Sequence, residues 1–104
     1  MAKIVNTANF RGTVEESNNV VVVDFFATWC GPCKMLAPVF DSLSEELTDV
    51  DFVKVDIDQS LELAQKFGIT TVPTMMIFKD GKVDDTLVGF MPKDNLKAKV
   101  QAHL

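Results

Sequence analysis

The chain is poor in the side chains that most often bind metals or carry out catalysis. Its 104 residues include two cysteines, one histidine and one tryptophan, and no tyrosine. A zinc site normally requires four ligands, and the only soft or imidazole ligand besides the cysteines is His103, at the far end of the chain. A zinc protein is therefore not expected. Glycine and proline are also scarce and 47% of the residues are apolar, which indicates a globular chain.

Excess positive charge and long hydrophobic runs are lacking as well. The formal net charge of −5 argues against a nucleic acid or an anionic membrane as the main partner. The amino end lacks the apolar segment of a signal peptide, and the longest apolar run, 20–27, is interrupted by Asp24 and is too short to span a bilayer. We expect one domain, 1–104, in the cytoplasm, where disulfides are usually catalytic or redox-sensing.

Apolar runs that alternate with helical patterns predict an α/β fold. Val20–Phe26 is apolar on both parities, which is typical of a central strand covered on both faces. Asp80-Gly81 is the strongest hairpin signal. We therefore predict the order βαβαβαββα, with a central mixed five-stranded sheet and helices on both faces. The predicted strands are 4–5, 20–26, 52–57, 74–79 and 82–88, and the predicted helices are 7–14 with Thr7 as N-cap, the cysteine stretch to about 47, 61–67 and 91–100.

The two cysteines lie in the stretch Trp29–Lys34, where a strand pattern stops and a helical pattern begins. Cys30 is therefore expected at a helix N-terminus, where free N–H groups and the helix dipole lower the pKa of a thiol. Cys33 follows one turn later, close enough for a disulfide. Gly31 leaves the thiolate uncovered, and Pro32 stiffens the turn. A purely structural disulfide is the weaker interpretation, because so short a loop adds little stability.

This arrangement predicts a disulfide-exchange mechanism. Cys30 as a thiolate attacks a partner disulfide, and Cys33 then displaces the reduced partner. Cys33 needs a base at that moment, and Asp24, inside the apolar strand, should be desolvated with a raised pKa. The alternative is that the strand ends early and Asp24 is solvated. Lys54 interrupts the neighbouring strand and either partners Asp24 or is solvated.

Three further features leave alternatives open. Trp29 is either a core residue or an exposed platform. Asp56 and Asp58 could suggest a metal, but two carboxylates that close a strand more often form a turn. Pro73 opens a central strand, an unusual place for proline, and a cis bond is the exception among X-Pro peptides.

Taken together, these features resemble the thioredoxin family, and the resemblance covers almost the whole chain. The resemblance rests on Asp24–Lys34, Pro38, Val72–Thr74, Phe78–Gly81 and Val88–Gly89. It implies the thioredoxin fold, with Pro73 cis and against the cysteine pair. It also implies Cys30 as exposed nucleophile, Cys33 as resolving thiol and Asp24 with Lys54 as a buried proton-handling pair. The implied docking and tuning residues are Trp29, Gly31, Pro32, Val72, Pro73, Thr74 and Gly89.

The resemblance also implies partners. A flavin- and NADPH-dependent thioredoxin reductase would regenerate the dithiol of a monomeric protein that binds no cofactor or metal. Disulfide-containing proteins, such as reductases and thiol peroxidases, would be substrates, and an extended segment could pair beside Pro73. Two residues depart from the family pattern. Phe26 stands where many members have a second tryptophan, and Phe90 is bulkier than expected after Gly89.

Three functions compete. The first is a protein-disulfide reductase that carries electrons as a dithiol. The second is a binding subunit that stabilises a larger assembly, with incidental redox activity. Intact Cys30, Cys33 and Asp24 favour the first, because a scaffold has no use for a desolvated carboxylate beside two thiols. The third, an oxidase or isomerase, is opposed by the Gly31-Pro32 dipeptide, which is associated with reducing members of the family.

Overall fold

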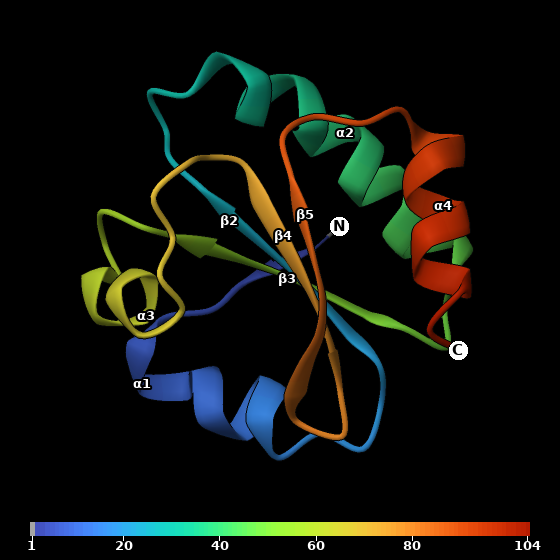
Figure 1. Cartoon of the computed structure of the whole chain (residues 1–104), viewed down its shortest axis with the longest axis horizontal. Helices are drawn as coiled ribbons and strands as arrows, with labels where there is room; N and C mark the ends of the chain where they lie inside the picture. Colours follow the sequence, from blue (N-terminus) through green and yellow to red (C-terminus); the bar gives the residue numbers. More distant parts are fainter. Residues whose placement is uncertain (1) are drawn as a thin grey trace.

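A five-stranded sheet forms the centre of the molecule (Figure 1), for which the computed structural model describes residues 2–104. No helix in that range is long and apolar enough to cross a membrane. The elements in chain order are β1 (Lys3–Ile4), α1 (Thr7–Phe10), the π-helix η1 (Arg11–Glu15), β2 (Val21–Phe26), α2 (Gly31–Glu46), β3 (Asp51–Asp56), α3 (Leu61–Lys66), β4 (Thr74–Lys79), β5 (Lys82–Val88) and α4 (Lys93–Gln101).

The sheet has the strand order β1-β3-β2-β4-β5. β3 runs parallel to both β1 and β2, whereas β4 is antiparallel to β2 and β5. β2 is therefore an inner strand with neighbours on both sides. Its Asp24 lies opposite Lys54 of β3 and Met75 of β4. The predicted fold class, a mixed five-stranded sheet with helices on both faces, is confirmed.

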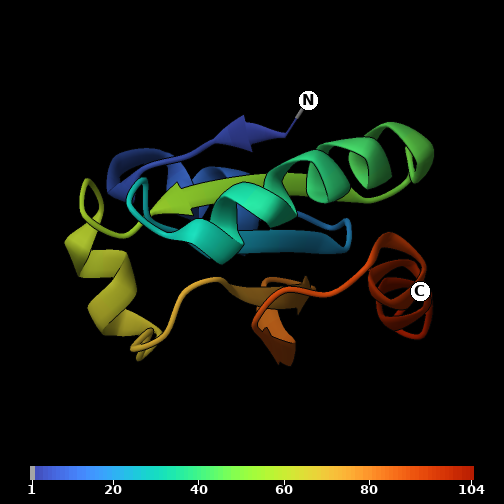
Figure 2. The same cartoon turned by 90° about the horizontal axis from the view of Figure 1, so that it is seen from above.

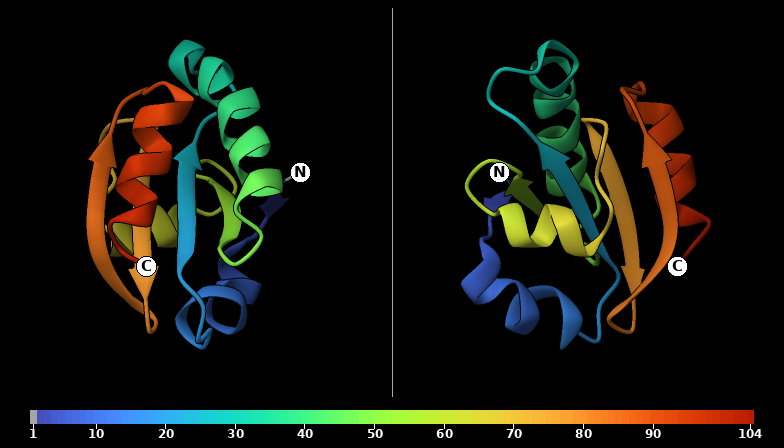
Figure 3. Two further views of the ribbon diagram at one scale, coloured as in Figure 1. Left: turned by 90° about the vertical axis from the view of Figure 1, so that its right-hand side faces the viewer. Right: turned by 60° about the vertical axis from the view of Figure 1, so that its left-hand side comes forward.

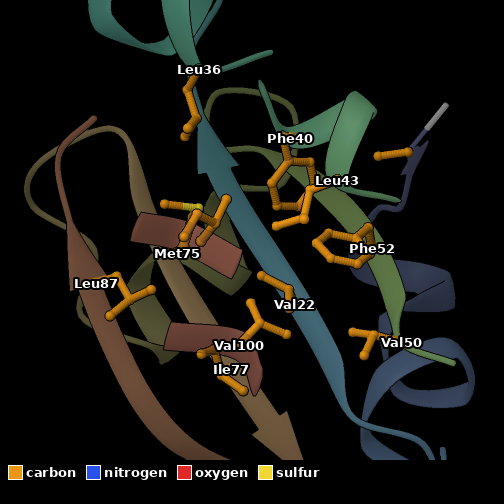
Figure 4. Packing of buried hydrophobic residues seen from close by; sticks show 12 residues of the cluster. Val22, Leu36, Phe40, Leu43, Val50, Phe52, Met75, Ile77, Leu87 and Val100 are labelled. Atoms are coloured by element: carbon orange, nitrogen blue, oxygen red, sulfur yellow. The ribbon is translucent and has the colours of Figure 1, made fainter. Parts of the chain in front are cut away.

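Helices cover the two faces of the sheet in pairs. α2 and α4 lie on one face, and α1 and α3 lie on the other (Figures 2 and 3). Figure 4 shows how apolar side chains of α2, α4 and four strands fill the space on the first face. Its largest fully buried members include Leu36, Phe40 and Leu43 from α2 and Met75 and Ile77 from β4. This packing fixes the position of α2 on the sheet. It therefore also fixes the N-terminus of α2, where the two cysteines lie.

The start of the chain differs slightly from the prediction. Asn6, not Thr7, caps α1: its side chain accepts a hydrogen bond from the Asn9 N–H (3.0 Å), and the Asn9 side chain accepts one from the Asn6 N–H (2.7 Å). Asparagine is a better N-cap than threonine, and the reciprocal bonds satisfy two donors. Phe10 and Val14, the predicted apolar pair, are both buried.

The hairpin between β4 and β5 has the predicted ends and turn. Asp80 and Gly81 have φ values of 52° and 78°, as a two-residue turn of the primed type requires. Gly81 also approaches the neighbouring η1 closely. A Cβ at this position would lie 2.1 Å from the carbonyl oxygen of Glu15. Glycine is therefore required here both by backbone conformation and by the lack of space.

Candidate active site

The two cysteines lie at the junction that the sequence predicted. β2 ends at Phe26, and Cys30 is the N-cap of α2, with Pro32 in its first turn. Cys30 and Cys33 form a disulfide with a Cα–Cα distance of 5.2 Å. The backbone N–H of Cys33 donates to Sγ of Cys30 at 3.2 Å. A donor aimed at this sulfur, together with the helix dipole, favours negative charge on Cys30 when the bond opens.

A loop from a distant part of the chain borders the disulfide. The Val72–Pro73 peptide is cis, as the resemblance implied, and Sγ of Cys30 lies 3.6 Å from the carbonyl oxygen of Val72. The N–H of Gly89 donates to the carbonyl of Pro73 at 2.8 Å. The Thr74 hydroxyl donates to a backbone carbonyl of the same loop. Residues far apart in sequence thus meet beside Cys30.

The disulfide is less exposed than the resemblance implied. Cys30 and Cys33 are each only 4% exposed and cluster with Ala27, with Phe26 and Val72 packed against them. Ile57 also packs against this cluster. In the disulfide form, both cysteines are therefore almost completely shielded from solvent.

The side chain of Trp29 is 67% exposed, so Trp29 is a surface residue and not a core residue. The indole N–H donates to Oδ2 of Asp58 at 2.9 Å. Asp56 accepts hydrogen bonds from the backbone N–H groups of Asp58 and Gln59, so the two aspartates form a turn, as the sequence favoured. Within residues 2–104 no group of three His, Cys, Asp or Glu side chains could hold a metal ion. Sequence reasoning missed the role of Asp58 in holding Trp29, since no local signal links residues so far apart.

Other apolar side chains near the site are also exposed. Val88, which precedes Gly89, is 63% exposed, and Phe90, which follows it, is 39% exposed. Met35 in the first turns of α2 is exposed as well. The sequence analysis named Gly89 as a docking residue and Phe90 as a departure from the family pattern, but it gave neither Val88 nor Met35 a place in the docking surface. Their residue types gave no signal, because methionine and valine are ordinary core residues.

Asp24 is fully buried, which excludes the solvated alternative. Neither of its carboxylate oxygens has a hydrogen-bond partner among the described residues. Burial raises the pKa of Asp24 from 3.8 to about 7; the positive charge of Lys54 lowers it, and the negative charge of Asp41 raises it further. The predicted raised pKa is confirmed. The carboxyl group can therefore gain or lose a proton near neutral pH.

Lys54 lies opposite Asp24 in the sheet but extends elsewhere. Its Nζ is 4.7 Å from the centroid of the Phe26 ring, and within residues 2–104 no ion pair joins it to Asp24. Lys54 lines a pocket of about 220 Å³ that also borders Cys33. The remaining lining residues are Phe26, Ala27, Thr28, Lys34 and Ala37.

The geometry defines a class of protein. A disulfide that closes a single helical turn contributes little to stability. Its position at a helix N-terminus, however, favours the thiolate form of a cysteine, which is the nucleophile in disulfide exchange. Disulfide exchange is the chemistry that this arrangement performs, so the molecule is a thiol–disulfide oxidoreductase.

Comparison with known proteins specifies the family. The family model described as Thioredoxin matches residues 1–102. The thioredoxin of Bacillus subtilis is 45% identical over 102 residues, covering 97% of this chain and 98% of the relative. Thioredoxin 1 of Synechococcus elongatus is 46% identical over 105 residues, covering 100% and 98%. The thioredoxin of Mycoplasmoides gallisepticum is 48% identical over 97 residues, covering 93% and 96%.

The chain belongs to the thioredoxin family. It is a protein-disulfide reductase that works through a redox-active cysteine pair, and its partners are disulfide-containing proteins and a reductase. The binding-subunit alternative is not favoured.

Proposed function

We propose that Cys30 is the nucleophile and Cys33 the resolving thiol. The Cys30 thiolate attacks one sulfur of a partner disulfide, and the other sulfur leaves as a thiolate. Cys33, deprotonated, then attacks Sγ of Cys30, and the partner's remaining sulfur leaves. Two electrons pass to the partner, and the Cys30–Cys33 disulfide remains. The observation that carries this order is the N–H of Cys33 directed at Sγ of Cys30 at the N-terminus of α2.

Asp24 is the proton acceptor for Cys33 in the second step, with Lys54 as its electrostatic partner. The support is a carboxyl group with a pKa of about 7 on the strand that leads into the cysteine stretch. A base is most effective when its pKa lies near the working pH. Asp24 does not line the pocket beside Cys33, so proton transfer would use a relaxed geometry or a bridging water.

A partner protein docks on the surface made by Trp29, Val72, Pro73, Thr74 and Gly89. The exposed Trp29 ring supports this surface, as does the position of Val72 beside Cys30. An extended segment would align with the backbone at Pro73 in the manner of an added strand. Pro73 and Thr74 contribute through their backbone, since both residues are buried. Gly31 and Pro32 tune the redox pair toward reduction.

Electrons come from an NADPH-dependent flavoprotein, thioredoxin reductase. The substrates are disulfide-forming reductases and thiol peroxidases, and the protein works in the cytoplasm as a monomeric single domain of residues 1–104. A net charge of −5 supports protein rather than nucleic-acid partners.

The order of the thiols can be tested with insulin as the partner. The Cys33→Ser variant should still attack and should accumulate a mixed disulfide, because the resolving thiol is gone. The Cys30→Ser variant should accumulate none, because it lacks the sulfur at the helix N-terminus that is stabilised as a thiolate. Mass spectrometry under non-reducing conditions measures both, with the double variant as background control. Equal accumulation by the two single variants contradicts the assigned roles.

The role of Asp24 needs a separate experiment. Asp24→Asn should slow the resolving step on the order of 100-fold, within the range for loss of a general base, and should leave the first attack nearly unchanged. Single-turnover kinetics with a preformed mixed disulfide on Cys30 isolates the second step. An unchanged second step would return Asp24 to a purely structural role.

A further inference from the structure

The side chain of Lys54 has two directions available to it. In the parallel pair of β2 and β3, Lys54 is the register partner of Asp24, and Asp56 is the register partner of Phe26. Side chains of opposite residues in a sheet project to the same face. Lys54 is half-buried, so its ammonium can either extend into the solvent or stay in the pocket close to Phe26 and Asp24.

The structure contains the second arrangement. The ammonium group of Lys54 lies over the face of the Phe26 ring, 4.7 Å from its centroid. That distance is within the range of a cation–π interaction, in which the negative face of the ring attracts the ammonium. Asp24 is meanwhile left without a hydrogen bond among the described residues. The aromatic ring, and not the carboxylate, thus contacts the charge.

The ring also fixes where the charge is. Phe26 is half-buried and packs against the cluster that contains both cysteines. Phe26, Lys54 and Cys33 line the same pocket. A positive charge held in this pocket acts on two groups at once, the buried carboxyl group of Asp24 and the Cys33 sulfur that becomes a thiolate during exchange.

We propose that Phe26 is a positioning residue for disulfide exchange, whose ring holds the Lys54 ammonium in the pocket beside Cys33 and within electrostatic reach of Asp24. This inference rests on the proposed function in one respect, the use of Asp24 as a base. It gives the aromatic face of Phe26 a role in the site, the contact with the Lys54 ammonium.

Few charged groups act on Asp24, so the effect of Lys54 on its pKa should be measurable. Lys54 of β3 supplies positive charge and Asp41 of α2 supplies negative charge. Lys34 and Cys33, also on α2, border the pocket. On the other side, β4 presents the uncharged Met75. Removal of Lys54 from the pocket should therefore raise the pKa of Asp24, because the positive charge of Lys54, which lowers this pKa, is lost.

A double-mutant cycle on the intact oxidised protein tests the placement. Phe26→Leu and Lys54→Met should each raise the pKa of Asp24, measured by carboxyl ¹³C NMR. In the Lys54→Met background, Phe26→Leu should produce no further shift, because its effect passes through Lys54. Phe26→Tyr keeps the ring and serves as the matched control, with a pKa equal to that of the parent.

Two results would overturn the placement. One is an equal shift from Phe26→Leu with and without Lys54, which would make the ring a general packing residue. The other is Phe26→Tyr behaving like Phe26→Leu, which would exclude the aromatic face as the cause. Far-UV circular dichroism of each variant checks that the fold is retained.

Kinetics then tests the consequence for the reaction. The pH profile of the resolving step, started from a mixed disulfide on Cys30, should move to higher pH in Phe26→Leu by the same amount as the pKa of Asp24. If the pKa moves and the profile does not, the base role of Asp24 and the kinetic effect of Phe26 are both overturned, although the contact with Lys54 stands. If the pKa does not move, the placement of Lys54 fails while the base role of Asp24 is unaffected.

Discussion

Replacing Asp24 with asparagine removes a carboxyl group that is fully buried and has no hydrogen-bond partner within residues 2–104. Its pKa is raised from 3.8 to about 7, chiefly by burial. Between these values the folded protein retains a proton that the unfolded chain has lost. Because the folded state binds more protons, stability falls as the pH rises through this interval. Below about pH 4 the group carries no such penalty.

The magnitude follows from the width of the interval. Each pH unit between the two pKa values corresponds to about 1.4 kcal/mol, and the interval from 3.8 to about 7 covers roughly three units. The ionised Asp24 therefore costs about 4 kcal/mol at pH 8 and almost nothing at pH 4. An asparagine remains uncharged at every pH. The Asp24→Asn variant should thus match the parent at pH 4 and exceed its stability by about 4 kcal/mol at pH 8, a large fraction of a typical 5–15 kcal/mol.

Urea unfolding of the oxidised protein, followed by far-UV circular dichroism, measures this difference. The oxidised form is chosen because disulfide-bonded cysteines do not titrate. With a typical urea dependence of 1–3 kcal/mol per molar, the midpoint at pH 8 should rise by about 2 M. Asp49→Asn, at an exposed site, is the matched control and should stay within about 0.5 kcal/mol. A stability difference that is the same at pH 4 and pH 8 would refute the reasoning.

Two further predictions concern sites away from the cysteines. Gly81→Ala places a Cβ 2.1 Å from the Glu15 carbonyl at a φ of +78°; we expect a loss of at least about 1–2 kcal/mol and a thermal midpoint lower by about 5 °C or more, whereas Gly31→Ala, with open space around its Cβ, should change little. Both ring nitrogens of His103 contact aspartates of β5, at 2.6 and 2.9 Å, and hydrogen bonds to these carboxylates raise its pKa above 6.5. Since that stabilisation is present below pH 6.5 and lost as the pH rises through the folded pKa, His103→Gln should lower the urea midpoint more at pH 5.5 than at pH 9, and an equal loss at both would contradict a charged histidine.

Local features of the fold were predictable because they depend on neighbours in sequence. The ends of β4 and β5 match the prediction, since the apolar run and the Asp80-Gly81 turn signal define them together. The start of α2 at the cysteines is likewise a local event, in which an apolar strand meets a helical pattern. Asn6 replaced Thr7 as the first cap because two adjacent residues compete for that role and the reciprocal bond to Asn9 decides between them.

The disulfide-exchange chemistry was also contained in the sequence. The sequence alone shows two cysteines three residues apart, an aspartate inside an apolar strand and a proline at the start of another strand. They identify the candidate groups and the reaction class. They do not place the groups relative to one another.

Contacts between distant residues needed the tertiary structure. The sequence left Trp29 undecided between core and surface, and the bond from its indole to Asp58, 29 residues away, places it at the surface. Lys54 could have paired with Asp24 or with solvent; instead its ammonium lies over the Phe26 ring. Val72 lies beside Cys30 although 42 residues separate them. Periodicity and turn signals report which face a residue occupies within its own element, whereas these contacts depend on how several elements pack, and only the folded chain determines that.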